Sequence, residues 1–204
     1  DALWEATEAQ FDLSCDALTY GGGDIGTVTI HGDAGGRSLD LSSVTARGTW
    51  GDVSLSAILR WAEDGAGSVA LSELQGTVNG HALRSARPLT ASWTADGVKV
   101  PPLSLDAFGG SISGNANRIG NEITLHVGLK GVNLAAVPKL QFGGRLDLEL
   151  TANGTVKVPV FTLKASSAQL TWRDTVASLT VDLGQDELGV DLRSLTARSE
   201  EHTS

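Results

Sequence analysis

The sequence has 204 residues but contains no methionine, one cysteine and only 5% aromatic residues. A single Cys15 cannot form a disulfide within the chain, so cysteine usage neither requires nor excludes an oxidising compartment. No apolar run approaches the roughly 20 residues that cross a bilayer as a helix. Asp1 begins the sequence with neither a basic n-region nor an apolar h-region of a signal peptide. We therefore expect a soluble piece of a longer protein.

Positive charge is also scarce, because 15 basic residues stand against 24 acidic ones and give a formal net charge of −9. Nucleic-acid binding proteins need a basic surface that displaces counterions from phosphates, so we expect no nucleic-acid partner. Hydrophobic residues make up 41% of the chain and charged residues 19%, which is too apolar for a disordered segment.

What the sequence does contain is alternation of apolar and polar residues, clearest in 98–100, 103–105, 123–129, 146–150, 168–172 and 179–183. Alternation puts every second side chain on one face of a strand, as in an antiparallel sheet with one apolar and one wet face. Glycine-containing turn signals recur at short intervals, among them 35–36, 79–80 and 153–154. The sequence predicts an all-β protein of about 16 short antiparallel strands at about 10 to 12 residues each.

Helical spacing is confined to 1–11 and to 132–140, where Pro138 interrupts it. We expect residues 1–16 and 199–204 to be irregular. Aromatic-glycine pairs begin at Tyr20, Trp50, Phe108 and Phe142, which suggests stacked units of about three strands each, with a degenerate unit near 79–80. No linker divides the chain, so we interpret residues 1–204 as one continuous array.

The ordered succession of these segments resembles the repeating pattern of TamB and other AsmA-like proteins of Gram-negative envelopes. The segments that carry the resemblance are 18–33, 46–51, 74–80, 88–93, 103–110, 113–116, 131–136 and 143–154. It extends over roughly residues 17 to 183 and consists of spacing and residue class, with no catalytic signature.

The resemblance implies an elongated antiparallel β-groove with an apolar concave face and a wet convex face. It also implies a periplasmic protein, tethered to the inner membrane by a segment outside this chain, that carries phospholipid towards the outer membrane. TamB-like proteins are further associated with assembly of outer-membrane proteins alongside a β-barrel partner. Phospholipid acyl chains are therefore the expected partner, and an outer-membrane β-barrel protein is a second one.

The residues themselves are compatible with this role, because the alternating apolar set is mostly leucine, valine and isoleucine and offers no shape for one particular ligand. We expect the following residues to line an acyl-chain groove: Val98, Val100, Leu103, Leu105, Ile123, Leu125, Val127, Leu129, Leu146, Leu148, Leu150, Leu170, Trp172, Leu179, Val181 and Leu183. Alternation alone does not separate an open groove from a closed β-sandwich, in which the same side chains would interdigitate.

Residues for catalysis or metal binding are not evident. His31, His81 and His126 lie far apart, no nucleophile elbow or phosphate-binding loop is present, and the polar position of His126 in its strand favours a solvated face. We expect no enzyme activity, cofactor or metal. Trp93 and Trp172 are in phase with their apolar neighbours, whereas Trp4, Trp50 and Trp61 could cover one end of the groove or belong to an ordinary core. Three functions stay open: a lipid-conducting groove, a scaffold that offers a strand edge to nascent β-barrel proteins, and a structural or adhesive array.

Overall fold

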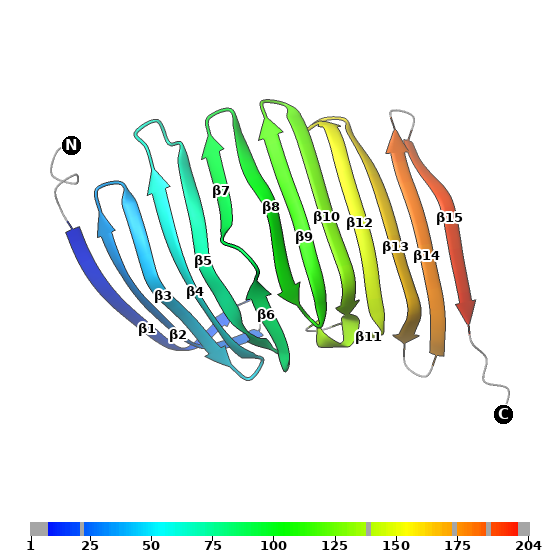
Figure 1. Ribbon diagram of the computed structural model, residues 1–204, viewed down its shortest axis with the longest axis horizontal. Coiled ribbons are helices and arrows are strands. Elements are labelled where there is room, and N and C mark those ends of the chain that lie inside the picture. Colours follow the sequence, from blue (N-terminus) through cyan, green and yellow to red (C-terminus); the bar gives the residue numbers. More distant parts are fainter. Residues whose placement is uncertain (1–7, 21–22, 138–139, 173–174, 187–188, 200–204) are drawn as a thin grey trace. The chain divides into compact units, whose positions relative to one another are not determined.

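The computed structural model describes residues 8–20, 23–137, 140–172, 175–186 and 189–199. The chain divides into two compact units, Asp1–Val100 and Pro101–Ser204. The described residues are almost entirely antiparallel strands, which confirms the predicted all-β class (Figure 1). One turn of 3-10 helix, η1 (Leu134–Ala136), is the only helix among them, and it falls within the weak helical spacing noted at 132–140.

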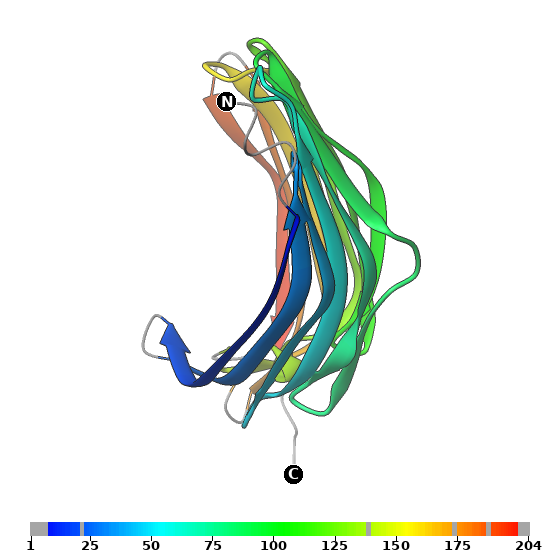
Figure 2. The same cartoon turned by 90° about the vertical axis from the view of Figure 1, so that its left-hand side faces the viewer.

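The first unit is one antiparallel sheet in which strands that follow each other in sequence are neighbours. β6 and β7 pair with the two halves of β5, so together they act as one strand interrupted at residues 86–88. Figure 2 shows that the long strands of this unit curve along their length. Its strands are β1 (Glu8–Tyr20), β2 (Gly23–Gly35), β3 (Ser38–Gly48), β4 (Gly51–Trp61), β5 (Gly67–Val78), β6 (His81–Ser85), β7 (Leu89–Thr94) and the beginning of β8 (Gly97–Ala107).

The second unit is also one antiparallel sheet, with the order β8-β9-β10-β12-β13-β14-β15 and the short β11 paired with β13. It contains the rest of β8, then β9 (Gly110–Ile119), β10 (Glu122–Asn133), β11 (Phe142–Gly143), β12 (Arg145–Thr155), β13 (Pro159–Trp172), β14 (Thr175–Asp186) and β15 (Gly189–Ser199).

The strands of each unit therefore belong to a single layer, and burial follows from this. Among the described residues the buried hydrophobic side chains are Ala57, Ala107, Val132 and Ala136, and no large side chain is fully buried. In a closed β-sandwich the inner leucines and valines would be covered by a second sheet. The closed alternative is therefore wrong, and the extended antiparallel sheet is the observed fold.

Three local expectations are corrected. Residues 8–16, expected to be irregular, belong to β1, which pairs with β2 except at Asp16 and Ala17, where the register shifts. Ser199, also expected to be irregular, is the last residue of β15 and pairs with Ala177; residues 1–7 and 200–204 lie outside the described part. Asn153 and Gly154, expected in a turn, pair with β13 inside β12, and the turn follows at 156–158.

The repeat has the expected length of about 30 residues but fewer strands than expected. Between Trp50 and Asn79 the chain forms β4 and β5, and between Phe108 and Phe142 it forms β9 and β10 with η1. The unit is thus a two-stranded hairpin of about 30 residues rather than three strands. Within one antiparallel sheet every second turn falls at the same end of the strands, so in each unit these turns lie side by side at one end of the strands.

Aromatic rings lie over glycines in the first unit. Gly67 pairs directly with Trp93 and with Trp61, and a Cβ at Gly67 would come within 2.4 Å of the Trp93 ring. Gly32 pairs with Phe11 in the same way, and a Cβ at Gly32 would lie 2.9 Å from the Phe11 ring. The Trp93 indole also donates a hydrogen bond to the carbonyl of Gly65, 3.0 Å away. A ring that covers a glycine restores the side-chain contact the glycine lacks.

We predict that Gly67→Ala lowers the free energy of unfolding by about 1–3 kcal/mol, because the new methyl group displaces the Trp93 ring and the nearby Arg60 carbonyl. Chemical denaturation followed by tryptophan fluorescence measures this loss. The control is Thr90→Ala, an exposed position in β7, which should change stability by less than about 0.5 kcal/mol. Equal stability of the two variants would contradict the packing described for Trp93.

Candidate functional site

Strand register gathers the apolar side chains of the second unit on one face. Directly opposed residues in an antiparallel pair point to the same side of the sheet. Val127 is opposed to Leu150, Leu150 to Leu163, and Leu163 to Leu183. This row continues to Leu192 in β15. A parallel row runs through Ile112, Leu129, Leu148, Ala165, Val181 and Leu195. We call this side the apolar face of the second unit.

Twelve of the sixteen residues expected to line a groove lie on this face, by opposition across strands and alternation along them: Ile123, Leu125, Val127, Leu129, Leu146, Leu148, Leu150, Leu170, Trp172, Leu179, Val181 and Leu183. Val98 belongs to the first unit, where it opposes Trp93, and Val100 follows it two residues later in β8. Leu103 and Leu105 are half-buried in the part of β8 that belongs to the second unit. That all sixteen line one groove stays a prediction.

A β-bulge keeps two of these residues in place. Leu163, Ala165 and Ser167 alternate onto the apolar face, which by simple counting would send Leu170 and Trp172 to the opposite side. The register shift between Ser167 and Leu170 adds one residue to β13, so that Leu170 opposes Ala177 and returns to the apolar face. Ala177 has the same parity in β14 as Leu179, which opposes Ser167. Bulges of this kind re-aim side chains without ending a strand.

Sequence reasoning missed several members of this face, chiefly Phe161, Leu163, Leu192 and Leu195. For Phe161 and Leu163 the signal was present, because residues 161–166 alternate between apolar and polar. It was harder to see in β15, where Arg193 breaks the alternation at a register shift.

The first unit has an equivalent face, of which sequence reasoning identified Val98, Val100 and Trp93. One of its rows comprises Leu13, Ile30, Val44, Leu55 and Leu74. A neighbouring row comprises Cys15, Val28, Ala46, Val53, Gly76 and Leu83. Both units therefore carry the same arrangement, with rows of mostly aliphatic side chains that run across the strands.

These apolar side chains are shielded mainly by their neighbours on the same face. Most are half-buried, and those near a sheet edge or strand end are more exposed, with 57% of Leu13, 48% of Trp172 and 60% of Leu195 accessible. The rings of Phe142 and Trp172 lie 6.4 Å apart, which places two aromatic residues at one end of the face. Partly exposed apolar side chains in contiguous rows are typical of a surface that binds an apolar partner.

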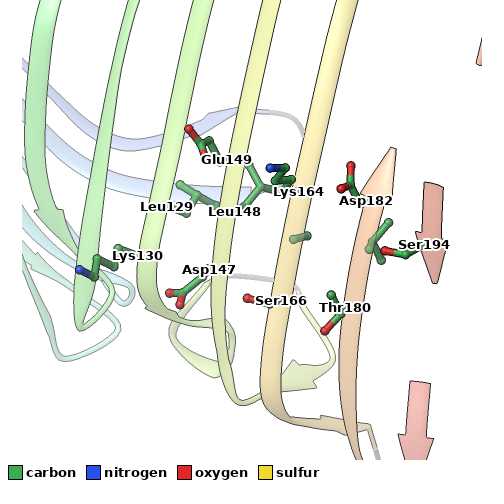
Figure 3. A pocket seen from close by; sticks show the side chains of 12 residues that line it. Leu129, Lys130, Asp147, Leu148, Glu149, Lys164, Ser166, Thr180, Asp182 and Ser194 are labelled. Carbon is green, nitrogen blue, oxygen red and sulfur yellow. The ribbon is translucent and has the colours of Figure 1, made fainter. Parts of the chain in front are cut away.

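The opposite side of the second unit is polar. Its central row opposes Glu149 to Lys164, Lys164 to Asp182, and Asp182 to Ser194, so charges of opposite sign alternate across the strands. The next row comprises Asp147, Ser166 and Thr180. Residues of both rows line a depression of about 480 Å³ together with Leu129, Leu148, Ala165 and Val181, which lie between the two rows along the strands (Figure 3). Because charges of opposite sign alternate in the central row, this row is compatible with solvent and offers no single-sign site.

Two contacts of the polar side involve acidic side chains. The Asp147 carboxylate accepts a hydrogen bond from the backbone N–H of Gly131 at 2.6 Å, at the β-bulge of β10. Nε2 of His126 lies 3.8 Å from a carboxylate oxygen of Glu149, which confirms that His126 belongs to the polar face. Among the described residues, no cluster of three or more His, Cys, Asp or Glu side chains is arranged to hold a metal ion.

The tryptophans have varied positions. Trp61 and Trp93 are on the apolar face of the first unit, in one row with Gly67 and Val98. Trp50 lies at the turn between β3 and β4, where its indole donates to the carbonyl of Ile25 at 3.0 Å. Trp4 lies outside the described residues.

Comparison with models of protein families, with curated proteins and with solved structures finds no match for this chain. In the described part of the chain, no helix has the length and apolarity needed to cross a membrane.

The open apolar face predicts an unusual tolerance of charge. We predict that Leu148→Arg lowers the melting temperature by less than about 8 °C, since the long side chain can reach water and each kcal/mol shifts a domain of this size by about 2–4 °C. Val132→Arg, in the adjacent strand β10, should unfold the protein because Val132 is only 3% exposed. Differential scanning calorimetry distinguishes the two variants, and unfolding of both would mean that the face around Leu148 is closed.

Proposed function

We propose that the apolar faces bind the acyl chains of phospholipid and that this protein carries phospholipid between two membranes. The observation that supports the proposal is the set of continuous rows of leucine, valine and isoleucine that no second layer covers within either unit. An enzyme pocket would need convergent polar groups, whereas the two rows described for the second unit, from Val127 to Leu192 and from Ile112 to Leu195, are aliphatic throughout.

The dimensions of the second unit suit an acyl chain. Strands lie about 4.8 Å apart, so the five gaps from β9 to β15 extend over about 24 Å. One leaflet accounts for half of the roughly 30 Å hydrocarbon thickness of a bilayer, so a single acyl chain is about 15 Å long there. Rows of this length accommodate one chain laid across the strands.

The energetics also support a carrier. An acyl chain of some 14 carbons costs roughly 10 kcal/mol to expose to water, at about 0.8 kcal/mol per methylene. Contact with aliphatic side chains removes much of this cost. Because lipid tails are about as apolar as leucine, transfer from a bilayer to such a face is nearly neutral, and the cargo can be released again.

The location that fits this function is the periplasm of a Gram-negative cell, with tethering to the inner membrane by a segment outside this chain. The support for this part of the proposal is the resemblance in spacing to TamB and AsmA-like proteins, together with a polar face suited to water on the other side of each sheet. The face does not distinguish head groups, because it provides few charges.

We predict that the purified chain binds a fluorescent fatty-acid probe and that phosphatidylcholine and phosphatidylglycerol displace the probe equally well. Leu150→Glu should weaken probe binding at least about tenfold, because the new carboxylate in the central row must be dehydrated whenever an acyl chain binds over it. Thr151→Glu is the matched control: it adds the same charge one residue later, on the polar face, and should bind the probe as the parent does.

Native mass spectrometry of the same samples identifies the lipid that remains bound. Equal weakening by Leu150→Glu and Thr151→Glu, or absence of binding in a chain shown by circular dichroism to be folded, would overturn the proposal. Binding of extended peptides in place of lipid would instead favour the scaffold for β-barrel proteins.

A further inference from the structure

A cavity of about 560 Å³ lies beside the β-bulge of β13, where β10 ends and β12 begins. The described residues that line it are Asn133, Gly144, Arg145, Ala168 and Gln169. None of these residues is acidic, and none has a large apolar side chain. This cavity therefore differs in chemistry both from the apolar face and from the row of alternating charges on the polar side.

Strand pairing and the bulge bring the polar side chains of the cavity together. Arg145 alternates with Asp147 along β12, so it belongs to the polar side. Asn133 is directly opposed to Arg145 across β10 and β12, and opposed residues point to the same side of a sheet. Gln169 lies in the bulge itself, between the paired positions 167 and 170. One guanidinium and two amides thus line a single cavity.

Backbone contacts hold the walls of the cavity in place. Gly144 has a φ of 99°, and a Cβ at this position would stand 1.8 Å from the carbonyl oxygen of Gln169. Only glycine allows β12 to begin so close to the bulge. The Gly144 carbonyl also accepts a hydrogen bond from the N–H of Leu134 at 2.9 Å. The main chain therefore sets the shape of the cavity.

The side chain of Asn133 is oriented as a donor. Its Oδ1 accepts a hydrogen bond from the backbone N–H of Ala135 at 3.2 Å, and its own backbone N–H donates to the Phe108 carbonyl at 2.9 Å. These two bonds fix the residue and leave Nδ2 with two hydrogens to donate. No acceptor in the described part of the chain binds them.

Arg145 forms no ion pair with the described residues. Asp147 is the neighbouring acidic residue on the same side of β12, and its carboxylate accepts the Gly131 N–H at 2.6 Å. Arg145 is exposed, so its five N–H donors are accessible. An unpaired guanidinium beside two amides favours an anionic ligand, although the chain as a whole has a net charge of −9.

We propose that this cavity binds a phosphate monoester through the Arg145 guanidinium and the side-chain amides of Asn133 and Gln169. A guanidinium binds phosphate oxygens with two parallel hydrogen bonds. A phosphate monoester has three terminal oxygens that accept hydrogen bonds, one for each of the three side chains, whereas a carboxylate has two oxygens. The cavity also has room for the group that the phosphate esterifies.

This inference does not depend on acyl-chain binding, because Arg145 and Asn133 belong to the polar side. A phosphate monoester has two possible sources: soluble phosphorylated compounds, and lipids whose head group is a bare phosphate. The cavity recognises the chemical group that both sources share.

The test is isothermal titration calorimetry of the full chain with methyl phosphate, in a phosphate-free buffer at constant ionic strength. The parent should bind methyl phosphate at one site, and dimethyl phosphate at least about tenfold more weakly, because the diester has less charge and fewer terminal oxygens. Arg145→Gln should raise the dissociation constant for methyl phosphate at least about tenfold. Asn133→Asp should have a similar effect, because aspartate still accepts the Ala135 N–H but presents a negative charge to the ligand.

Asn117→Asp and Arg84→Gln are the matched controls. They make the same two substitutions at exposed positions in β9 and β6, away from the cavity, and should leave the dissociation constant within about twofold of the parent. Circular dichroism verifies that every variant is folded. A parent that binds no methyl phosphate, equal affinity for monoester and diester, or controls that weaken binding as much as Arg145→Gln and Asn133→Asp would each overturn the proposal.

A second titration separates the two sources of the monoester. It compares glycerol 3-phosphate with dihexanoyl phosphatidic acid, which carries the same phosphate on two short acyl chains. Tighter binding of glycerol 3-phosphate supports a soluble ligand, and tighter binding of the lipid supports a head group. Arg145→Gln should weaken both, and unchanged binding of both would contradict the site. Leu150→Glu, on the apolar face, should leave glycerol 3-phosphate binding unchanged, so failure of the acyl-chain proposal is distinguishable from failure of this one.

Discussion

The structure depends on one constraint: antiparallel strands must keep their register for alternating side chains to collect on one face. A slip of a single residue would move every leucine of a strand to the polar side. In this chain the register holds through rows such as Val127, Leu150, Leu163 and Leu183, which cross four strands without interruption. The apolar faces and the row of alternating charges on the other side follow from that register, and the proposed binding of acyl chains rests on it. Each unit is a single layer, so this registration, rather than enclosure by a second layer, shields the side chains.

Bulges maintain the register over long strands. In strongly curved neighbouring strands the paired residues drift out of register along the strand, and one extra residue in one strand restores the pairing. β10 contains such a correction between Leu129 and Val132, where Gly131 has a φ of 62° and its N–H is bound by Asp147. A side chain at Gly131 would be strained in that conformation, so glycine is required there. Similar shifts occur at Ser167–Leu170 in β13 and at Asp182–Leu183, opposite Arg193 of β15.

These features explain how far the sequence alone can predict the structure. Alternation was sufficient to predict an antiparallel all-β protein and to place residues such as Leu125, Leu148 and Leu183 on one face. It did not predict β1, whose alternation is disturbed at a bulge between Cys15 and Leu18. It also did not separate a closed sandwich from an open sheet, because both present the same pattern along each strand and differ only in what lies opposite the apolar face. The hairpin repeat was misjudged because β6 and β7 together take the place of one strand.

The central claim is that acyl chains lie on the apolar face, and the site of covalent capture tests it most directly. A phospholipid with a photoactivatable diazirine in its acyl chain is first bound to the protein. The complex is then irradiated, and mass spectrometry locates the modified residues. The account predicts adducts on Leu150 and Leu163, which oppose each other on the apolar face. Their sequence neighbours Thr151 and Thr162 oppose each other on the polar face and should stay unmodified. Adducts concentrated on Thr151 and Thr162, or distributed equally between the two faces, would contradict it.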